Sequence, residues 1–330
     1  KGNRGVIVSS QRDTFINRLF ERAQEDKDIH LISVDMGAPS LDRWRQELPD
    51  QFIAAGISEQ NAINYAAGLS ASGKKVYVYF MAAWVARCFE QIRYSCAMAN
   101  NPITILGNGV GLGYAPAGPA HEPNEDIAYM RSLCGIEIYS PANSNITESL
   151  VDLTCDYPKL RYIRLERSYP NILDETHSFK KHSRQYLEMG LFPVFPGLAE
   201  PRRMLERPKI AILSSGYMLG RAHSVYKRLI ENGYEVSVID VWKIKQLDLN
   251  KFSETVMPYE ILVTLEEQTL SGGFGSAICE LVVDANIKKD ILRIGLPERY
   301  IFENGNRDHL LNTNGLSVDE IYDKIIKFCD

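Results

Sequence analysis

Polar side chains able to take part in catalysis follow several of the short apolar runs that we expect to form strands. They are Asp35, Glu59, Asn108, His121 and Arg167. In an open sheet of parallel strands the carboxyl ends lie along one edge, so we expect these side chains to gather there. Carboxylate, imidazole, amide and guanidinium groups at one edge could exchange protons with a ligand and hold its anionic end.

Glu59 stands where a helix is expected to begin, directly after a strand that ends near Gly56. Its position alone favours a surface glutamate in a first helical turn, which the helix dipole stabilises by ~0.3–1 kcal/mol. The helix that follows is rich in small residues, so the carboxylate should lie against a tightly packed surface. A carboxylate buried there could share a proton with a ligand nitrogen. The residues alone leave both interpretations open.

Segments typical of strands and of helices alternate through the first half of the chain. This alternation predicts a mostly parallel sheet with helices on both faces. Short apolar runs indicate strands at 30–34, 52–55, 76–80, 103–106, 136–139 and 162–165. Helical spacing indicates helices at 14–24, 61–72, 126–133 and 143–154, and a further one is indicated by Val85, Cys88, Phe89, Ile92 and Cys96.

A change of composition divides the chain into two α/β domains. Residues 168–207 are rich in proline, charge and aromatic residues, which indicates a linker. A second series follows, with strands expected at 209–213, 236–239, 261–265 and 291–294 and helices at 220–231 and 318–328. We therefore predict a doubly wound, mostly parallel domain over 1–170, a linker over 171–207 and a smaller α/β domain over 208–330.

Composition excludes several classes of protein. The 330 residues include 37 Lys+Arg against 42 Asp+Glu, a formal charge of −5, so nucleic acid and anionic membranes are not expected partners. No apolar run reaches the ~18–20 residues needed to cross a bilayer. The chain begins without the apolar stretch of a signal peptide.

The six cysteines are scattered and form no C-x-x-C pair. Free, reduced thiols in a cytoplasmic protein are the favoured interpretation. Neither the cysteines nor the six histidines have the spacing of zinc ligands, so we expect this chain to hold no metal by itself.

Three blocks of sequence resemble transketolases and 1-deoxyxylulose-5-phosphate synthases, in the order in which these enzymes have them. The first is similar to the family segment that holds an essential glutamate, the second to Gly-Pro-(Thr/Ala)-His followed by Glu-Asp-Ile-Ala-x-Met-Arg, and the third to the family's C-terminal domain. The blocks are Gly56–Asn61 with Ala66–Leu69, Gly118–His121 with Glu125–Arg131, and Thr264–Glu267 with Gly272–Ser276 and Gly295–Pro297.

The resemblance implies a pyrimidine-binding domain followed by a transketolase C-terminal domain, and thiamine diphosphate as the cofactor. In this family the diphosphate is bound through Mg²⁺ or Ca²⁺ held by a Gly-Asp-Gly…Asn motif, and no Gly-Asp-Gly occurs in this chain. We favour a naturally split enzyme whose partner subunit has the metal site, assembled as a heterotetramer with two copies of each chain. A fragment of a longer polypeptide is the alternative.

The resemblance also implies roles for particular residues. Glu59 would bond N1′ of the cofactor's pyrimidine and so activate the cofactor. Trp84 would stack on that ring, because its spacing to Arg87 fits the family, with Phe80 as the alternative; Arg87 belongs to the same group. His121 would face the reacting carbon and bond substrate oxygens.

Two further segments complete the expected site. Asp35 and Met36, in a segment that continues to Ser40, resemble family residues near the thiazolium ring, and Ser40 would contact substrate. Arg167 matches an arginine that grips a substrate phosphate or carboxylate, and Asn108 stands in the substrate-binding block. Core packing for Trp84, a turn for Asp35 and a salt bridge for Arg167 are the alternatives.

Departures from the family pattern weaken the prediction of an ordinary pentose phosphate as substrate. Where transketolases have His-Asp-Ser and a later Asp, this chain has Gly107–Gly109 and Ala117, with Tyr114–Pro116 inserted nearby. The favoured function is transfer of a two-carbon ketol unit in carbohydrate metabolism, to an unusual sugar or a smaller aldehyde. The alternatives are a decarboxylating enzyme that takes pyruvate or another 2-oxo acid, and a non-catalytic assembly subunit.

Overall fold

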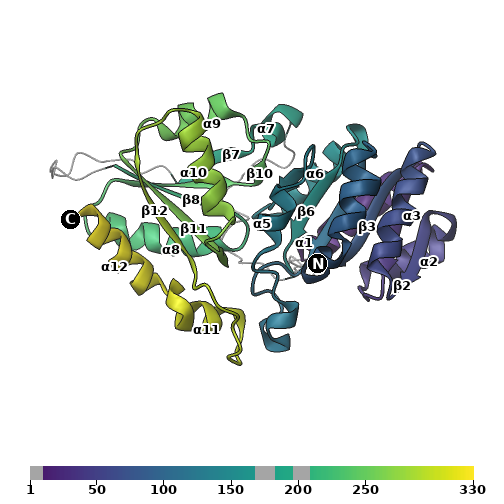
Figure 1. Ribbon diagram of the computed structural model, residues 1–330, viewed down its shortest axis with the longest axis horizontal. Helices are drawn as coiled ribbons and strands as arrows, with labels where there is room; N and C mark the ends of the chain where they lie inside the picture. The colour runs from purple at the N-terminus through teal and green to yellow at the C-terminus, as the bar shows by residue number, and fades with distance from the viewer. Residues whose placement is uncertain (1–9, 168–182, 196–208) are drawn as a thin grey trace, which may run out of the picture.

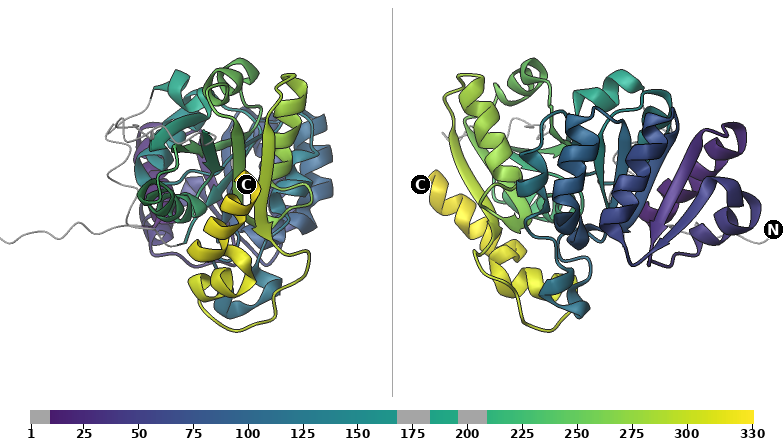
Figure 2. Two further views of the ribbon diagram at one scale, coloured as in Figure 1. Left: turned by 90° about the vertical axis from the view of Figure 1, so that its left-hand side faces the viewer. Right: turned by 45° about the vertical axis from the view of Figure 1, so that its right-hand side comes forward.

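The computed structural model describes residues 10–167, 183–195 and 209–330, arranged as two sheets that follow one another along the longest axis of the molecule (Figures 1 and 2). The first sheet has the strand order β10-β5-β6-β4-β3-β1-β2 and is parallel except for β10. Its strands are β1 (Ile29–Val34), β2 (Phe52–Gly56), β3 (Lys75–Met81), β4 (Ile103–Asn108), β5 (Glu137–Tyr139), β6 (Arg161–Leu165) and β10 (Lys243–Lys245).

The second sheet has the order β12-β11-β8-β9-β7 and is parallel except for β7. Its strands are β7 (Leu191–Phe195), β8 (Ile210–Ser214), β9 (Val236–Val241), β11 (Ile261–Thr269) and β12 (Asp290–Leu296). The predicted α/β class with two mostly parallel sheets is therefore confirmed.

Helices cover both faces of the first sheet because its central strands are apolar on both sides. Val76, Val78 and Phe80 of β3 pack in one hydrophobic cluster, whereas Tyr77 and Tyr79 pack in another on the opposite face. The first face is covered by α3 (Glu59–Ala71), η2 (Ala82–Cys88), α4 (Phe89–Gln91), η3 (Ile92–Met98) and α5 (Asp126–Arg131). The opposite face is covered by α1 (Gln11–Glu25), α2 (Ser40–Glu47), α6 (Ser144–Asp156) and α7 (Arg184–Met189).

The cluster beneath α3 and α5 continues into the second domain, where it includes residues of β8, β9, β11, α9 and α10. The other face of the second sheet packs against α8 and α12. The helices of this half are α8 (Met218–Glu231), α9 (Leu249–Val256), α10 (Phe274–Asp284), α11 (Arg307–Leu311), η6 (Asn312–Leu316) and α12 (Val318–Cys329). The two domains thus share one continuous apolar core.

Two segments lie elsewhere than the predicted boundaries place them. Residues 184–195, expected in the linker, form α7 and β7, and β7 pairs with β9 in the second sheet; the remainder of 171–207 is outside the described residues. Strand β10, expected inside the C-terminal domain, pairs with β5 in the first sheet. Both strands are antiparallel edge strands of three to five residues, which sequence patterns detect poorly.

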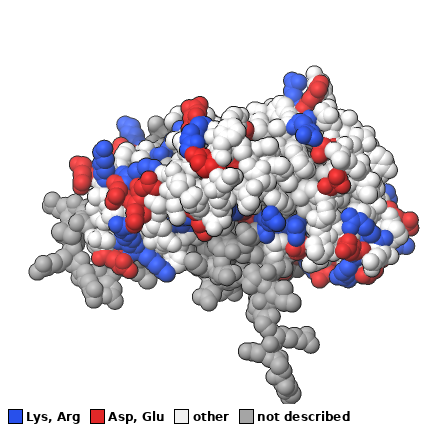
Figure 3. All heavy atoms as spheres, turned by 90° about the horizontal axis from the view of Figure 1, so that it is seen from below, with Lys and Arg blue, Asp and Glu red and all other residues white. Residues whose placement is uncertain are grey.

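Acidic and basic side chains are interspersed on the face shown in Figure 3, with no large block of either sign among the described residues. Within the described ranges no helix is both long and apolar enough to cross a bilayer. All six cysteines are free, as predicted, and Cys88, Cys96 and Cys155 are buried.

Candidate active site

Glu59 is the first residue of α3, where the chain leaves the edge strand β2 through a tight turn. Gly56 has φ +69°, a conformation that favours glycine, and the Ser58 hydroxyl donates to the carbonyl oxygen of Ala55 over 2.6 Å. The Glu59 side chain is only 5% exposed, and Arg87 Nη1 donates to its Oε2 over 3.2 Å. The carboxylate is therefore nearly buried and is held by a single arginine that is itself 51% exposed.

Trp84 and His121 complete a contiguous group with this pair. The Arg87 guanidinium carbon lies 5.8 Å from the centre of the Trp84 ring, and the Trp84 and His121 rings meet edge to face at 6.1 Å. Both rings are half-buried. His121 Nδ1 is buried and has no hydrogen-bond partner among the described residues. We call Glu59, Trp84, Arg87 and His121 the Glu59 cluster.

The structure separates the other cofactor candidates. Phe80 is fully buried in the core, so the prediction that it could stack on a bound ring is wrong, and Trp84 is the aromatic residue left for that role. Asp35 is exposed and Met36 half-buried just after β1. Because β1 lies between β2 and β3 in the sheet, these two residues stand at the same edge as Glu59 and Trp84.

A second group of polar residues lies at the same edge near β4 and β6. The Asn108 amide donates to the hydroxyl of Tyr114 over 2.9 Å, and the guanidinium carbon of Arg167 lies 4.8 Å from the centre of the Tyr114 ring. Burial raises the pKa of Tyr114, while the charges of Arg167 and Arg12 oppose this shift. We call Arg12, Asn108, Tyr114 and Arg167 the Tyr114 cluster.

Ser40 joins this group through the start of α1. Its hydroxyl donates to Asp13 over 2.8 Å, and Arg12 donates to both oxygens of Asp13, over 3.0 and 2.7 Å. Although burial opposes it, hydrogen bonds from Arg12, Ser10 and Ser40 lower the pKa of Asp13. The predicted substrate residues Ser40, Asn108 and Arg167 therefore stand around one polar region.

Sequence reasoning missed Arg12 and Tyr114. A signal existed for Arg12, because an arginine in the first turn of a helix opposes the helix dipole and needs another reason to be there. Tyr114 is a single large aromatic residue in a run of glycines between positions 107 and 118, a place where a loop needs no bulky side chain. Neither signal identifies the neighbours that the fold brings to these residues.

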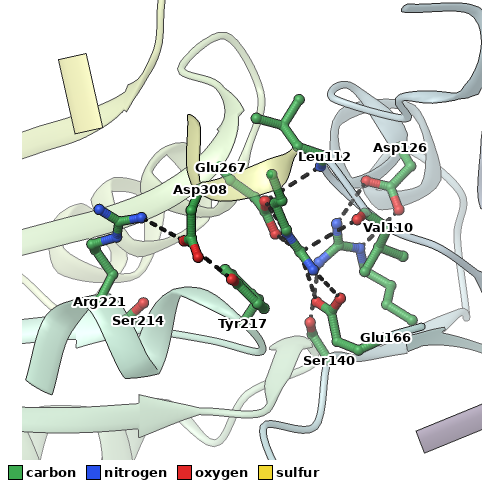
Figure 4. Close-up of polar contacts among 12 residues, drawn as sticks. Val110, Leu112, Asp126, Ser140, Glu166, Ser214, Tyr217, Arg221, Glu267 and Asp308 are labelled. Atoms are coloured by element: carbon green, nitrogen blue, oxygen red, sulfur yellow. Dashed lines mark hydrogen bonds and ion pairs between the residues drawn. The ribbon is translucent and has the colours of Figure 1, made fainter. Parts of the chain in front are cut away.

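A third cluster, which we call the Arg307 cluster, joins the two domains (Figure 4). Arg307 at the start of α11 bonds Glu166, which follows β6, over 2.7 Å, and also bonds both oxygens of Glu267 in β11. All three side chains are buried. Leu112 N donates to Glu267 over 3.3 Å, and the Tyr217 ring lies 3.6 Å from the Arg307 guanidinium carbon. Burial raises the pKa of Glu267, although Arg307 opposes the shift.

A buried carboxylate also fixes the segment between His121 and α5. Asp126, the first residue of α5, accepts hydrogen bonds from Arg164 over 2.8 and 3.2 Å and from the Tyr162 hydroxyl over 2.8 Å. Thr269 N of β11 donates to the carbonyl oxygen of Asn124 over 3.2 Å. The C-terminal domain therefore helps to position His121.

An open pocket of about 440 Å³ lies where the two domains meet at this edge. The loop after β4 and the segment that leads into α11 lie side by side there in Figures 1 and 2. Its lining residues are Leu112, Gly113, Ala115, Pro116, Arg167, Asn306, Arg307 and Asp308. Arg167 thus borders both this pocket and the Tyr114 ring.

Comparison with known proteins agrees with this architecture. Residues 10–171 match the pyrimidine-binding domain of transketolase and residues 199–321 match the transketolase C-terminal domain. One of the two subunits of the apulose-4-phosphate transketolase of Phocaeicola vulgatus is 30% identical over 96% of both chains. Two α/β domains in this order, with a buried glutamate at the sheet edge, define the class; the chain belongs to the transketolase family.

More distant relatives set the limits of this assignment. The 1-deoxy-D-xylulose-5-phosphate synthase of Caldanaerobacter subterraneus is 29% identical, and the chain spans about half the length of that synthase, 49%. A solved split-gene transketolase, described as an inactive beta4 tetramer, has a TM-score of 0.80 at 24% identity over 97% of this chain and 98% of that one. A transketolase mutant of Pichia stipitis has a TM-score of 0.76 at 17% identity over 97% of this chain and 46% of that one. These two structures share the fold.

The Glu59 cluster has the chemistry needed for the aminopyrimidine part of thiamine diphosphate. It offers a nearly buried carboxylate to a ring nitrogen, a half-buried aromatic ring to stack on, and an unpartnered imidazole nitrogen beside them. Among the described residues no group of three or more His, Cys, Asp or Glu side chains could hold a metal ion.

Proposed function

We propose that this chain is one subunit of a thiamine-diphosphate-dependent transketolase that moves a two-carbon ketol unit from a ketose to an aldehyde. A partner subunit holds the diphosphate and its Mg²⁺ or Ca²⁺, and two copies of each chain form the active enzyme. The main support is the position of Glu59, nearly buried at the sheet edge, next to Trp84 and His121. The relative from Phocaeicola vulgatus, itself named as a transketolase subunit and matched over 96% of both chains, supports the same proposal.

Each member of the Glu59 cluster has a distinct task in this proposal. Glu59 shares a proton with the pyrimidine nitrogen, and Arg87 exchanges part of its contact with Glu59 for this ligand. Trp84 holds the ring by stacking, which adds ~0.5–1.5 kcal/mol to burial. His121 bonds a substrate oxygen, and its Nδ1 is available because no described residue occupies it. The bound cofactor supplies a carbanion centre for breaking and forming carbon–carbon bonds.

The Tyr114 cluster holds the anionic end of the substrate in this proposal. Arg12 is already paired with Asp13, whereas Arg167 is exposed and borders the pocket between the domains. A guanidinium group matches phosphate or carboxylate through two parallel hydrogen bonds, which suits Arg167 to this task.

The proposal is tested by combining the chain with the subunit that carries the Gly-Asp-Gly…Asn domain. Xylulose 5-phosphate and apulose 4-phosphate are offered as donors with ribose 5-phosphate and glyceraldehyde 3-phosphate as acceptors, and the two-carbon shift is followed by mass spectrometry. We expect transfer only when both chains and thiamine diphosphate are present. No transfer with any of these pairs, together with release of carbon dioxide from pyruvate, would replace the proposal with the decarboxylating alternative, which the synthase relatives favour.

Cofactor binding has its own readout in this chain. Trp44 and Trp242 are fully buried, and Trp84 is the half-buried one of the three tryptophans. Thiamine diphosphate should therefore quench the fluorescence of the complex through Trp84, and Trp84→Phe should abolish that quenching. Normal assembly with no quenching would support the non-catalytic alternative.

A further inference from the structure

Tyr114 fills space at the sheet edge that the sequence of the preceding loop leaves empty. Gly109 has φ +73°, and a Cβ atom there would overlap the Tyr114 ring at Cε2 and Cδ2. A Cβ atom on Gly107 would lie 2.6 Å from the ring of Tyr162. Both glycines next to Asn108 are therefore covered by tyrosine rings, and Asn108 is the side chain of the three that contributes polar atoms at this point.

The Tyr114 hydroxyl occupies one half of the Asn108 amide and leaves the other half without a partner. Asn108 is 0% exposed, its Nδ2 donates to Tyr114 over 2.9 Å, and its Oδ1 has no hydrogen-bond partner among the described residues. Whichever way the amide is turned, one of its two polar atoms is held by Tyr114 and the other is free. A buried polar atom without a partner is uncommon and indicates a place for a ligand group.

The face of the same ring supports Arg167. The guanidinium carbon lies 4.8 Å from the centre of the ring, and Arg167 also borders the 440 Å³ pocket. Stacking on an aromatic face restricts the orientation of a guanidinium group, so the arginine needs less ordering when it binds an anion. Tyr114 is therefore the side chain that joins the buried amide to the exposed cation.

We propose that Tyr114 sets the length of the substrate: it positions Arg167 for a terminal phosphate and Asn108 for a nearby hydroxyl or carbonyl oxygen. Both contacts lie against one tyrosine side chain, so the two groups of the substrate can be no farther apart than that side chain is long. This requirement selects a short phosphorylated aldehyde over a pentose phosphate. The inference rests on the proposed ketol transfer and names its acceptor class.

The test compares kcat and KM of the two-subunit complex for glyceraldehyde 3-phosphate and ribose 5-phosphate. The wild type should favour the three-carbon acceptor in kcat/KM. Tyr114→Leu should shift the ratio of the two kcat/KM values toward ribose 5-phosphate by about tenfold or more, mainly through KM. Tyr114→Phe, which keeps the ring but loses the bond to Asn108, should keep the ratio and lower both values by about fivefold, the size of one hydrogen bond.

Tyr157→Leu is the matched control, because Arg184 lies 3.8 Å over that ring at the end of α6, away from the proposed site. It should leave the ratio unchanged, and fluorescence quenching by thiamine diphosphate should be normal in all variants. A wild type that prefers ribose 5-phosphate, or a ratio that changes less than twofold in Tyr114→Leu, would overturn the proposal.

Binding without turnover separates this inference from the proposed function. The same two phosphates are titrated into the cofactor-loaded complex without a ketose donor, and their dissociation constants are measured by calorimetry. If no donor supports transfer but Tyr114→Leu changes the ratio of the two constants, the substrate-length role stands and ketol transfer fails. If transfer occurs and neither ratio responds to the substitution, the substrate-length role alone fails.

Discussion

Glu59 and Glu267 are both nearly buried carboxylates bonded to an arginine, and the difference between their surroundings separates a reactive site from a structural one. Glu59 has one described partner, Arg87, which is half exposed. Glu267 shares a fully enclosed arginine with Glu166 and accepts a further bond from the backbone at Leu112. The first carboxylate has bonding capacity left for a ligand, whereas the second has used it within the protein.

The comparison also teaches how the two domains divide the work. The Glu59 cluster is built by elements of the first sheet alone, at an edge that faces outward. The Arg307 cluster joins β6, β11 and α11, so it is the joint that holds the C-terminal domain against the catalytic edge. Substitutions in the first cluster should change turnover, and those in the second should change stability.

The largest expected effect comes from Glu59→Gln in the two-subunit complex. Loss of the proton-sharing carboxylate should lower kcat by roughly 10²–10⁴-fold, the contribution typical of general acid–base catalysis. The unfolding midpoint in urea should barely move, because Arg87 remains solvated. Glu90→Gln, an exposed neighbour on α4, is the control. Turnover within threefold of the wild type would remove Glu59 from the mechanism.

Arg307→Met should be the most destabilising of these substitutions. It leaves Glu166 and Glu267 buried without their cation, at a cost of about 3–5 kcal/mol in the free energy of unfolding. Arg299→Met, which removes a half-exposed pair with Glu303, should cost less than ~1 kcal/mol. Changing both glutamates to glutamine in the Arg307→Met background should restore much of the loss. Equal urea midpoints for the two arginine variants would contradict the proposed joint.

Glu122 lies between the two regions and should make stability depend on pH. It directly follows His121, neither carboxylate oxygen has a partner among the described residues, and burial, with the charges of Glu267 and Glu303, raises its pKa to about 7. The folded state therefore keeps this proton longer than the unfolded state, so stability falls as pH rises from about 4.5 to about 7.

Glu122→Gln removes that ionisation. The variant should gain about 1–3 kcal/mol over the wild type at pH 8 and much less at pH 5, measured by urea unfolding at both pH values. Glu90→Gln should show no such difference between the two pH values. A gain of the same size at pH 5 would show that packing, rather than the charge, is responsible.

Trp84→Leu should give the smallest effect. Loss of stacking should weaken thiamine diphosphate binding to the complex by ~0.5–1.5 kcal/mol, about 2- to 12-fold in the dissociation constant measured by calorimetry. Tyr157→Leu, which removes a ring far from the cofactor, serves as the control. Unchanged affinity would mean that the ring is held by other contacts.

Much of the fold could be predicted from the sequence because its strands are buried on both faces and stand out as apolar runs. The predicted strands at 76–80 and 103–106 lie within β3 and β4. The helical spacing from Val85 to Cys96 was also correct, but the segment divides into a 3₁₀ helix, one short α-helical stretch and a π-helix, which residue spacing does not distinguish. Glu59, Trp84 and His121 were found through family motifs, and the structure brings them together.

The rest depended on tertiary contacts that local patterns do not record. Arg12 and Tyr114 come from different elements and meet only when the loop after β4 folds over the sheet edge. Phe80 and Trp84 are four residues apart and equally aromatic, yet only the fold shows that the first is fully enclosed. The short strands β7 and β10 depend on their partner strands for their conformation.

Strand β10 makes the first domain inseparable from the second. It covers the edge of β5, and Lys243 within it reaches Glu137, whose carboxylate also meets Arg161. A fragment cut at the predicted boundary near residue 170 would present an uncovered β5 and a buried glutamate short of one cation, features that promote self-association of an expressed fragment. Chimaeras that exchange C-terminal domains between relatives would therefore need to keep residues 243–245 with the first half.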